Sequence, residues 1–246
     1  MLGRLATGAG IAVLAAAAAA GAARAGFPHF GSGCARADFR SGGTTVRAER
    51  CGPAQGQRAV VVLHGCGGFG TFDHTLATDL PKFGIATLDV DLFARTPPPG
   101  KRGFCSGGGR GLENPFPLWE QTTVDAARSL EKHYRRVGAV GWSLGAGVAI
   151  ATAEDTHAFD AVAAFSALAF PPVLDDAARL PPSIFLDGGK HDIVPPSNAR
   201  ALYAATQRAH VPSALFVYPD GTHDWPGRQG DLGRRRAAKF LDRYLG

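Results

Sequence analysis

The chain has 246 residues, of which 45% are hydrophobic and 19% are charged, so it can bury a core and is neither a disordered polar tract nor a multi-span membrane protein. Its 33 glycines and 17 prolines follow no G-X-Y period, which excludes collagen and predicts many turns. The formal net charge is +5, and the mostly scattered arginines have no interleaved aromatic residues to stack bases, which disfavours nucleic-acid binding.

Residues 1–25 have the features of a secretory signal peptide. Arg4 precedes an apolar run over 5–20, and Ala23-Arg24-Ala25 then fits the small-x-small cleavage rule. An uncleaved membrane anchor is the alternative, but the run is short for spanning and rich in alanine. We therefore expect a single mature domain over 26–246, located in the periplasm or secreted, with no stable membrane association after cleavage.

Four cysteines follow the leader: Cys34, Cys51, Cys66 and Cys105. An even number in an exported protein predicts two disulfides, with three pairings possible. We favour Cys34 with Cys51, because they flank a segment whose alternating pattern is typical of a hairpin or an edge strand. Cys66 with Cys105 then follows by elimination, although Cys66 as a free, buried small residue stays an alternative.

The first core strand is expected over 58–64, a β-branched apolar run that leads into a glycine-rich loop. A helix over 73–83 and a strand over 85–90 follow, with Gly84 as the helix stop. The stretch 94–117 is dense in glycine and proline without periodicity. Segments of this length in compact domains are commonly lids or binding loops.

The second half of the chain alternates between helices and short apolar strands. The expected helices are 118–136, 144–152, 197–209 and 231–244, and the expected strands are 137–141, 161–165, 183–187 and 214–218. This alternation predicts an α/β fold in which helices cover both faces of a mostly parallel central sheet.

A G-x-S-x-G motif is centred on Ser143, where an apolar strand is expected to stop and a small-residue helix to begin. This strand-turn-helix setting is the one that a nucleophile elbow requires. Side chains at Gly141 and Gly145 would collide with neighbouring backbone, and the helix N-terminus favours a nearby oxyanion. A plain glycine-rich helix start is the alternative.

A serine hydroxyl needs a base to remove its proton, and a carboxylate to hold that base. Of the eight histidines, His223 lies in a glycine-containing loop after the last expected strand, where it can reach back over the sheet edge. Asp192 lies in the loop after strand 183–187. We prefer it to Asp187, which is better placed to cap the turn.

The order Ser143, Asp192, His223 and the motifs at 64–68, 141–145, 192–195 and 221–223 resemble the α/β-hydrolase superfamily, and most closely the dienelactone hydrolase family. The resemblance spans roughly 58–245 and implies the α/β-hydrolase fold. The namesake enzymes use a cysteine nucleophile, whereas this chain has Ser143, which favours a general serine esterase.

The resemblance also implies backbone oxyanion donors, which in this chain are the N–H groups of Leu144 and Cys66. Similar family members carry an Asp, an Arg and a Cys after the second core strand. Here those residues are Asp91, Arg95 and Cys105.

The resulting hypothesis is an exported serine hydrolase that cleaves a small-molecule ester or lactone through an acyl-enzyme and uses no cofactor. An acyltransferase with the same triad and a non-catalytic binding protein are the alternatives. No zinc spacing such as H-E-x-x-H occurs, and His64 fits a structural role in which its ring bonds nearby backbone.

Candidate substrate-binding residues are Arg95, Phe104 and Trp225. An arginine can hold a substrate carboxylate, but solvated loop arginines are commoner. Aromatic rings can line an acyl pocket, and ordinary core packing explains them equally well. Arg102, Arg110, Phe116 and Trp119 are further candidates of the same kind.

Overall fold

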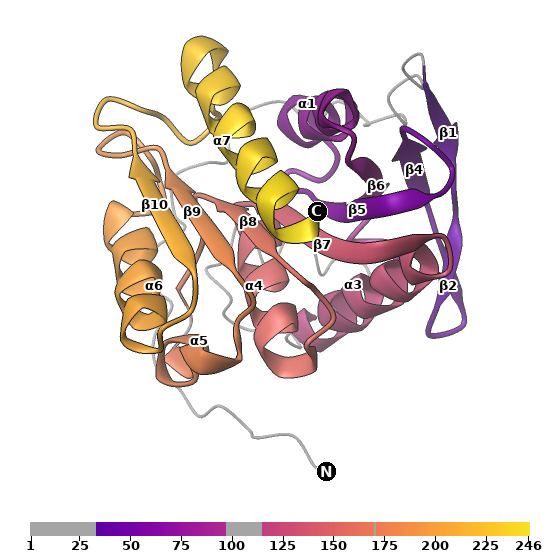
Figure 1. The fold of residues 1–246 in the computed structure, drawn as a ribbon, viewed down its shortest axis with the longest axis horizontal. Coiled ribbons are helices and arrows are strands. Elements are labelled where there is room, and N and C mark those ends of the chain that lie inside the picture. Colours follow the sequence, from indigo (N-terminus) through magenta and orange to yellow (C-terminus); the bar gives the residue numbers. More distant parts are fainter. Residues whose placement is uncertain (1–32, 97–114, 170) are drawn as a thin grey trace.

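An eight-stranded sheet forms the centre of the protein (Figure 1). The computed structural model describes residues 33–96, 115–169 and 171–246. The expected signal peptide lies outside the described residues, as do Arg102, Phe104, Cys105 and Arg110. The strand order is β1-β4-β6-β5-β7-β8-β9-β10, and every pair from β6 to β10 is parallel. The mostly parallel sheet is therefore confirmed.

The strands are β1 (Cys34–Arg36), β2 (Phe39–Ser41), β3 (Thr44–Val46), β4 (Ala48–Cys51), β5 (Gly56–Leu63), β6 (Ala86–Val90), β7 (Tyr134–Trp142), β8 (Val162–Phe165), β9 (Ser183–Asp187) and β10 (Ser213–Val217). The helices are α1 (Thr71–Asp79), α3 (Phe116–Glu131), α4 (Leu144–Thr156), α5 (Pro171–Asp175), α6 (Pro196–Arg208) and α7 (Gly227–Leu245), with 3-10 turns η1 (Leu80–Phe83) and η2 (Ala177–Arg179).

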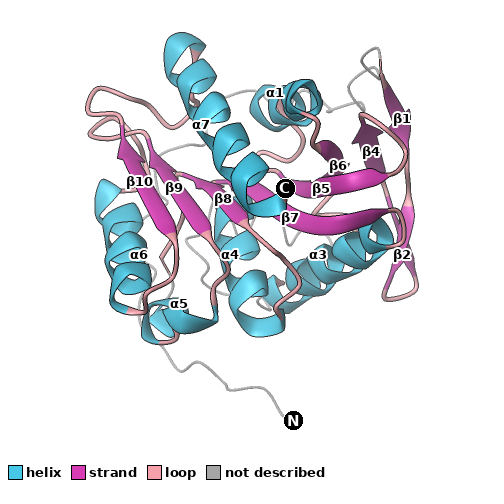
Figure 2. Cartoon of the chain, viewed as in Figure 1, coloured by secondary structure: helices cyan, strands magenta, loops and turns pink. Residues whose placement is uncertain are grey.

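Helices cover both faces of this sheet (Figure 2). One apolar cluster joins the sheet to α3, α4 and α6, and the other joins it to α1 and α7. The middle strand β5 lies between β6 and β7, and its residues from Ala59 to Leu63 are fully buried. A strand that is buried on both faces must be apolar throughout, which is why this run showed no alternation.

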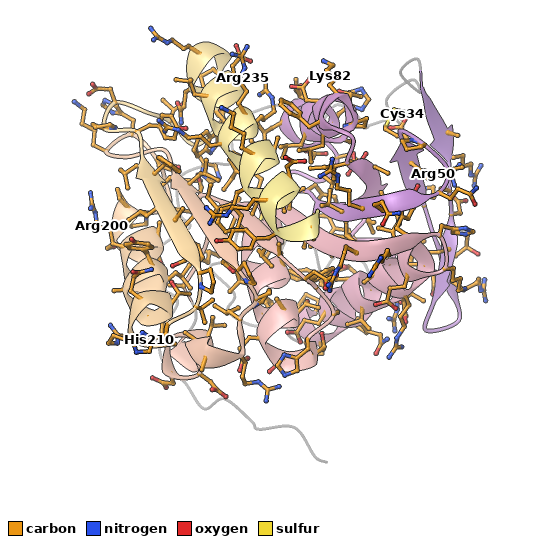
Figure 3. The ribbon with its side chains drawn as sticks, in the orientation of Figure 1. Cys34, Arg50, Lys82, Arg200, His210 and Arg235 are labelled. Atoms are coloured by element: carbon orange, nitrogen blue, oxygen red, sulfur yellow. A yellow bond between two sulfur atoms is a disulfide. The ribbon has the colours of Figure 1, made fainter. Side chains whose placement is uncertain are left out.

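The predicted Cys34–Cys51 disulfide is present, and it joins two residues that face each other across the antiparallel pair β1 and β4. Cys34 lies at the edge of the molecule (Figure 3). None of the described cysteines is a free thiol. Because Cys105 lies outside the described residues, its pairing with Cys66 stays a prediction.

Several elements differ from expectation. The helix expected over 118–136 ends at Glu131, and β7 already begins at Tyr134. Tyr134 continues the apolar stripe of the helix, but pairing of this segment with β5 outweighs the helical periodicity. The helix expected over 73–83 divides into α1 and η1, and Gly84 ends it in the left-handed region at φ 73° as predicted. The short helix α5 was not predicted.

Three carboxyl groups are buried together between α1 and the strands β4 and β6: Glu49, Asp73 and Asp89. Neither carboxyl oxygen of Asp89 has a hydrogen-bond partner among the described residues. Burial raises the pKa of Asp89 well above its usual value, and the neighbouring charges of Asp73 and Glu49 add to this effect. Burial also raises the pKa of Asp73 to about 7. These groups bind protons more tightly in the folded than in the unfolded chain, so their contribution to stability falls as the pH rises from about 4 through 7.

Replacing Asp89 by asparagine is therefore expected to stabilise the fold at pH 8, because the amide has no charge to bury. The gain should shrink at pH 5, where the carboxyl group is protonated at little cost. Urea unfolding of the wild type and of Asp89→Asn at both pH values measures this difference in the free energy of unfolding.

Asp79 at the end of α1 provides the matched control. Burial alone would raise the pKa of Asp79, but hydrogen bonds from Lys82 and Arg234 outweigh it and lower the pKa. Asp79→Asn should therefore destabilise the fold at pH 8. An Asp89→Asn variant that is also less stable at pH 8 than the wild type would contradict this account of the cluster.

Candidate active site

Ser143 occupies the turn between β7 and α4, with φ 56° and ψ −117°. The flanking glycines make this turn possible. A Cβ atom at Gly141 would lie 2.3 Å from the carbonyl oxygen of Gly145, and one at Gly145 would lie 2.3 Å from that of Leu63. A positive φ at a serine is strained and is held only by well-determined surroundings. The strand-turn-helix arrangement expected at Ser143 is therefore present, which is the setting that a nucleophile elbow requires.

The loop after β5 lies directly beside this turn. A Cβ atom at Gly65 would come within 2.8 Å of the Trp142 ring and 3.3 Å of the Cβ of Ser143. Cys66 is the next residue of that loop, and Leu144 is the first residue of α4. The two expected oxyanion donors therefore belong to segments that flank Ser143 on either side.

His64 is fully buried in the same loop, and both of its ring nitrogens face backbone groups. Its Nε2 accepts the N–H of Leu92 at 3.1 Å, which leaves the proton on Nδ1 to be donated to the carbonyl oxygen of Gly65 at 2.8 Å. This arrangement agrees with the structural role expected for His64.

His223 connects Ser143 to Asp192. Its Nε2 lies 3.0 Å from the Oγ of Ser143, and its Nδ1 lies 2.6 Å from the Oδ1 of Asp192. The indole N–H of Trp142 donates to the backbone carbonyl of His223 at 2.9 Å, which ties the histidine loop to the end of β7. Because the carboxylate accepts at Nδ1, the proton resides there, and Nε2 is free to accept the proton of Ser143.

The Asp192 carboxylate is fully buried and accepts four hydrogen bonds. His223 and the N–H of Val194 donate to Oδ1, and Ser166 and the N–H of Gly188 donate to Oδ2. Burial alone would raise the pKa of Asp192, but the hydrogen bonds from His223 and Ser166 outweigh it and lower the pKa. The group therefore stays ionised beside His223 at neutral pH.

Asp187, the other carboxylate considered for this role, lies at the end of β9. Its Oδ1 accepts the N–H of Gly189 at 2.9 Å, while its buried Oδ2 has no partner among the described residues. Burial raises the pKa of Asp187 to about 6. Asp187 thus caps the turn, and Asp192 is the carboxylate in contact with His223.

The sequence profile of the dienelactone hydrolase family matches residues 46–241. The chain belongs to this family. The family is one of hydrolytic enzymes with the α/β-hydrolase fold, and the family and fold expectations are confirmed. No curated protein sequence matches this dienelactone hydrolase family member.

Solved structures with the same fold include several hydrolases at low sequence identity. A dienelactone hydrolase-like promiscuous phosphotriesterase from metagenomic libraries has a TM-score of 0.72 at 16% identity, covering 87% of this chain and 98% of its own. The dienelactone hydrolase from Anabaena variabilis has a TM-score of 0.68 at 19% identity. The match covers 87% of this chain and 98% of the Anabaena chain. An esterase from Pyrobaculum calidifontis has a TM-score of 0.65 at 16% identity, covering 85% of each chain.

The candidate substrate-binding residues of this family member fall in different environments. Arg95 donates to the Oγ of Ser41 at 2.9 Å, beside the hairpin of β2 and β3. Trp225 is 2% exposed and packs among the rings of Phe72, Phe165 and Tyr218, so its indole lies in the core behind the triad. Phe104 lies outside the described residues. The structure therefore brings neither Arg95 nor Trp225 into hydrogen-bond contact with Ser143, His223 or Asp192 among the bonds of the described chain.

One residue of the site was missed by the sequence analysis. Ser166 follows β8, is fully buried, and places its hydroxyl 2.5 Å from Asp192. No motif surrounds it, because its partners are far away in the chain. Its only local signal is a short apolar strand that ends in a polar residue at the carboxyl edge of the sheet.

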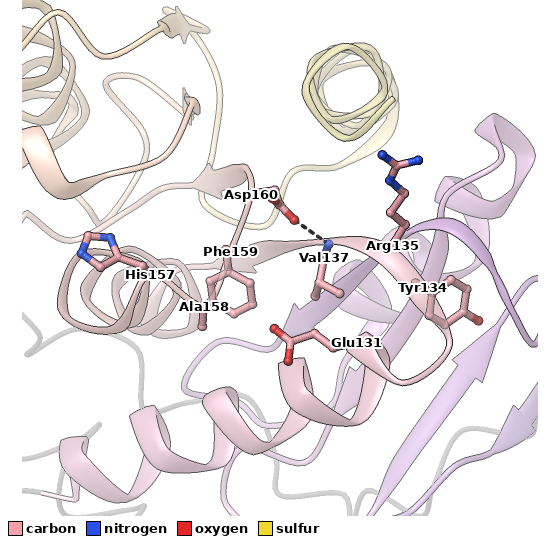
Figure 4. Close-up of a pocket in the computed structure, with 8 residues that line it drawn as sticks. All are labelled: Glu131, Tyr134, Arg135, Val137, His157, Ala158, Phe159 and Asp160. Carbon is pink, nitrogen blue, oxygen red and sulfur yellow. Dashed lines mark hydrogen bonds between the residues drawn. The ribbon is translucent and has the colours of Figure 1, made fainter.

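A cavity of about 330 Å³ lies at the opposite edge of the sheet, where β7 begins (Figure 4). Glu131, His157 and Asp160 are among the residues that line it. Ser143 follows the other end of β7, so this cavity is remote from Ser143 and its contacts with His223 and Asp192.

Two further properties concern the described part of this family member. Its helices are too short or too polar to cross a membrane. The one group of His, Cys, Asp and Glu side chains there that is close enough to share a metal ion is Cys34, Glu49 and Cys51, and the disulfide engages both of its sulfur atoms.

Proposed function

We propose that this dienelactone hydrolase family member is a serine hydrolase that cleaves carboxylic esters through an acyl-enzyme. The supporting observation is the continuous contact from Ser143 through His223 to Asp192, at 3.0 and 2.6 Å. Separations of this size allow a proton to pass from the hydroxyl to the imidazole during attack. The lowered pKa of Asp192 keeps a negative charge beside the imidazolium that then forms.

In the proposed reaction the Oγ of Ser143 attacks the ester carbonyl while His223 accepts its proton at Nε2. His223 then returns this proton to the leaving alcohol as the tetrahedral intermediate collapses to the acyl-enzyme. Water, deprotonated by His223, releases the acid and restores the serine hydroxyl.

The developing oxyanion needs donors placed before the reaction begins. The N–H of Leu144 lies at the positive end of α4, and the N–H of Cys66 belongs to the loop that packs against Ser143. We assign the oxyanion hole to these two groups.

We also propose that the chain acts after export, as a single domain over 26–246. The Cys34–Cys51 disulfide supports this, because such bonds persist in oxidising compartments. Small-molecule esters and lactones are the proposed substrates, and no nucleic acid or cofactor takes part. N-terminal sequencing of the exported protein should begin at Gly26, whereas a start at Met1 would contradict cleavage.

The proposed nucleophile is tested by fluorophosphonate labelling with peptide mapping. The label is expected on Ser143 in the wild type and is expected to be absent in Ser143→Ala and strongly reduced in His223→Ala. Absence of labelling together with absence of p-nitrophenyl acetate hydrolysis would contradict the proposal and favour a binding protein. Product analysis with an alcohol or thiol acceptor distinguishes hydrolysis from acyl transfer.

A further inference from the structure

Ser166 and Trp225 extend the contacts of the candidate triad into the core. The indole Nε1 of Trp225 lies 3.0 Å from the Oγ of Ser166, and that Oγ lies 2.5 Å from the Oδ2 of Asp192. Together with the contacts of His223, five side chains form one continuous line from Trp225 to Ser143.

The chemistry of the groups fixes the direction of each hydrogen bond. An indole N–H can only donate, so the Ser166 hydroxyl accepts from Trp225. A carboxylate can only accept, so the proton of the same hydroxyl points to Asp192. The hydroxyl thus has both of its roles assigned and cannot rotate to another partner without breaking one of these bonds.

The outer end of this line is held by packing. Trp225 is 2% exposed, and its ring meets Phe165 at 5.0 Å and Tyr218 at 5.2 Å between centroids. A Cβ atom at Gly233 of α7 would lie 2.9 Å from the indole ring, so the helix backbone also lies close against it. The indole N–H therefore has a fixed position relative to the sheet.

The backbone supplies a second, independent observation. Five non-glycine residues of the described chain have positive φ, and three of them are Ser143 (56°), Ser166 (49°) and Trp225 (51°). Such conformations cost about 1 kcal/mol or more each and persist where the surroundings determine them, often at active sites. The backbone N–H of Ser166 donates to Leu186 at 2.7 Å, which fixes the strained residue to β9.

We propose that Ser166 is a positioning residue for the Asp192 carboxylate and that Trp225 anchors it. Ser166 donates the one side-chain hydrogen bond to Oδ2 in the described structure and, together with the N–H of Gly188, restrains rotation of the carboxylate, so that Oδ1 stays directed at Nδ1 of His223. This keeps the proton on Nδ1 and leaves Nε2 available to Ser143. The inference rests on the proposed esterase function, because the effect is exerted on the catalytic base of that reaction.

The test compares Ser166→Ala with the wild type and with Ser183→Ala. Ser183 is an equally buried serine whose hydroxyl donates to the Pro181 carbonyl at 2.8 Å, at the opposite end of β9 from Asp187. Ser166→Ala should lower kcat for p-nitrophenyl acetate about tenfold with KM within about twofold of the wild type. Ser183→Ala should leave both constants unchanged, even if it unfolds at lower urea concentration.

Proton NMR spectroscopy tests the position of the Asp192 carboxylate directly. The proton shared by His223 and Asp192 gives a low-field proton resonance, which should shift in Ser166→Ala and Trp225→Phe and stay in place in Ser183→Ala. Ser166→Gly removes the same hydroxyl while relieving the positive φ, so it tests the idea if the alanine variant folds poorly. Ser166→Gly should show the same tenfold loss of kcat.

Wild-type kcat and an unshifted resonance in both Ser166 variants would overturn the positioning role and leave the esterase proposal intact. If instead the wild type has no Ser143-dependent hydrolysis, the esterase proposal fails. In that case the resonance alone decides whether Ser166 positions Asp192.

Discussion

His223→Ala is expected to lower kcat for ester hydrolysis by roughly a million-fold. No other side chain among the described contacts of Ser143 accepts its proton, since His223 Nε2 is the nitrogen at 3.0 Å from Oγ. Without this base the hydroxyl is a poor nucleophile, and the leaving alcohol loses its proton donor. Steady-state kinetics with p-nitrophenyl acetate and the unfolding midpoint in urea measure activity and folding separately.

His191→Ala is the matched control for this loss. His191 is an exposed histidine that immediately precedes Asp192, and its backbone forms an isolated β-bridge with Thr222 of the His223 loop. The His191→Ala variant should retain nearly the full kcat of the wild type. If His223→Ala kept more than about a hundredth of wild-type activity, the assignment of His223 as general base would be wrong.

Asp192→Asn is expected to lower kcat by about ten thousand-fold with little change in fold. The asparagine amide has one accepting and one donating end, whereas Asp192 accepts four hydrogen bonds. If the amide donates to Nδ1 of His223, the imidazole proton moves to Nε2, which can then no longer accept from Ser143. The loss should therefore appear in kcat far more than in KM.

Asp187→Asn separates this effect from a general loss of charge at the same sheet edge. Asp187 is also fully buried, and burial raises its pKa to about 6, so the variant removes a neighbouring carboxyl group of the same kind. We expect its kcat at pH 8 to stay within about threefold of the wild type. Equal losses in Asp187→Asn and Asp192→Asn would contradict the choice between the two carboxylates.

The sharp turn at Ser143 was predictable because its cause is local. Gly141, Ser143 and Gly145 are close in sequence, and the two glycines are required by the backbone approaches that the structure shows within that turn and to Leu63. For His223 and Asp192, the sequence predicted only the approximate place in the fold. Parallel strands bring their carboxyl ends to one edge, so loops after β9 and β10 had to meet near the end of β7.

Other features could not be read from the sequence. Tyr134 fitted the helical stripe, yet its segment pairs with β5 from a distant part of the chain. Trp225 was a candidate for an acyl pocket, and the structure instead places it in the core against Phe165. Periodicity reports which side chains are apolar, but it does not report which buried surface they cover.

The sequence by itself determined the family, most of the order of strands and helices, and the turn that carries Ser143, because local patterns of apolar residues, glycines and motif spacing specify each of them. Only the tertiary structure showed that Asp192, and not Asp187, contacts His223, and that Ser166 contacts the Asp192 carboxylate. Those two outcomes depend on hydrogen bonds that span 31 and 26 positions of the chain. Contacts of this range are set by how the sheet packs its loops together, and no local pattern in the chain encodes them.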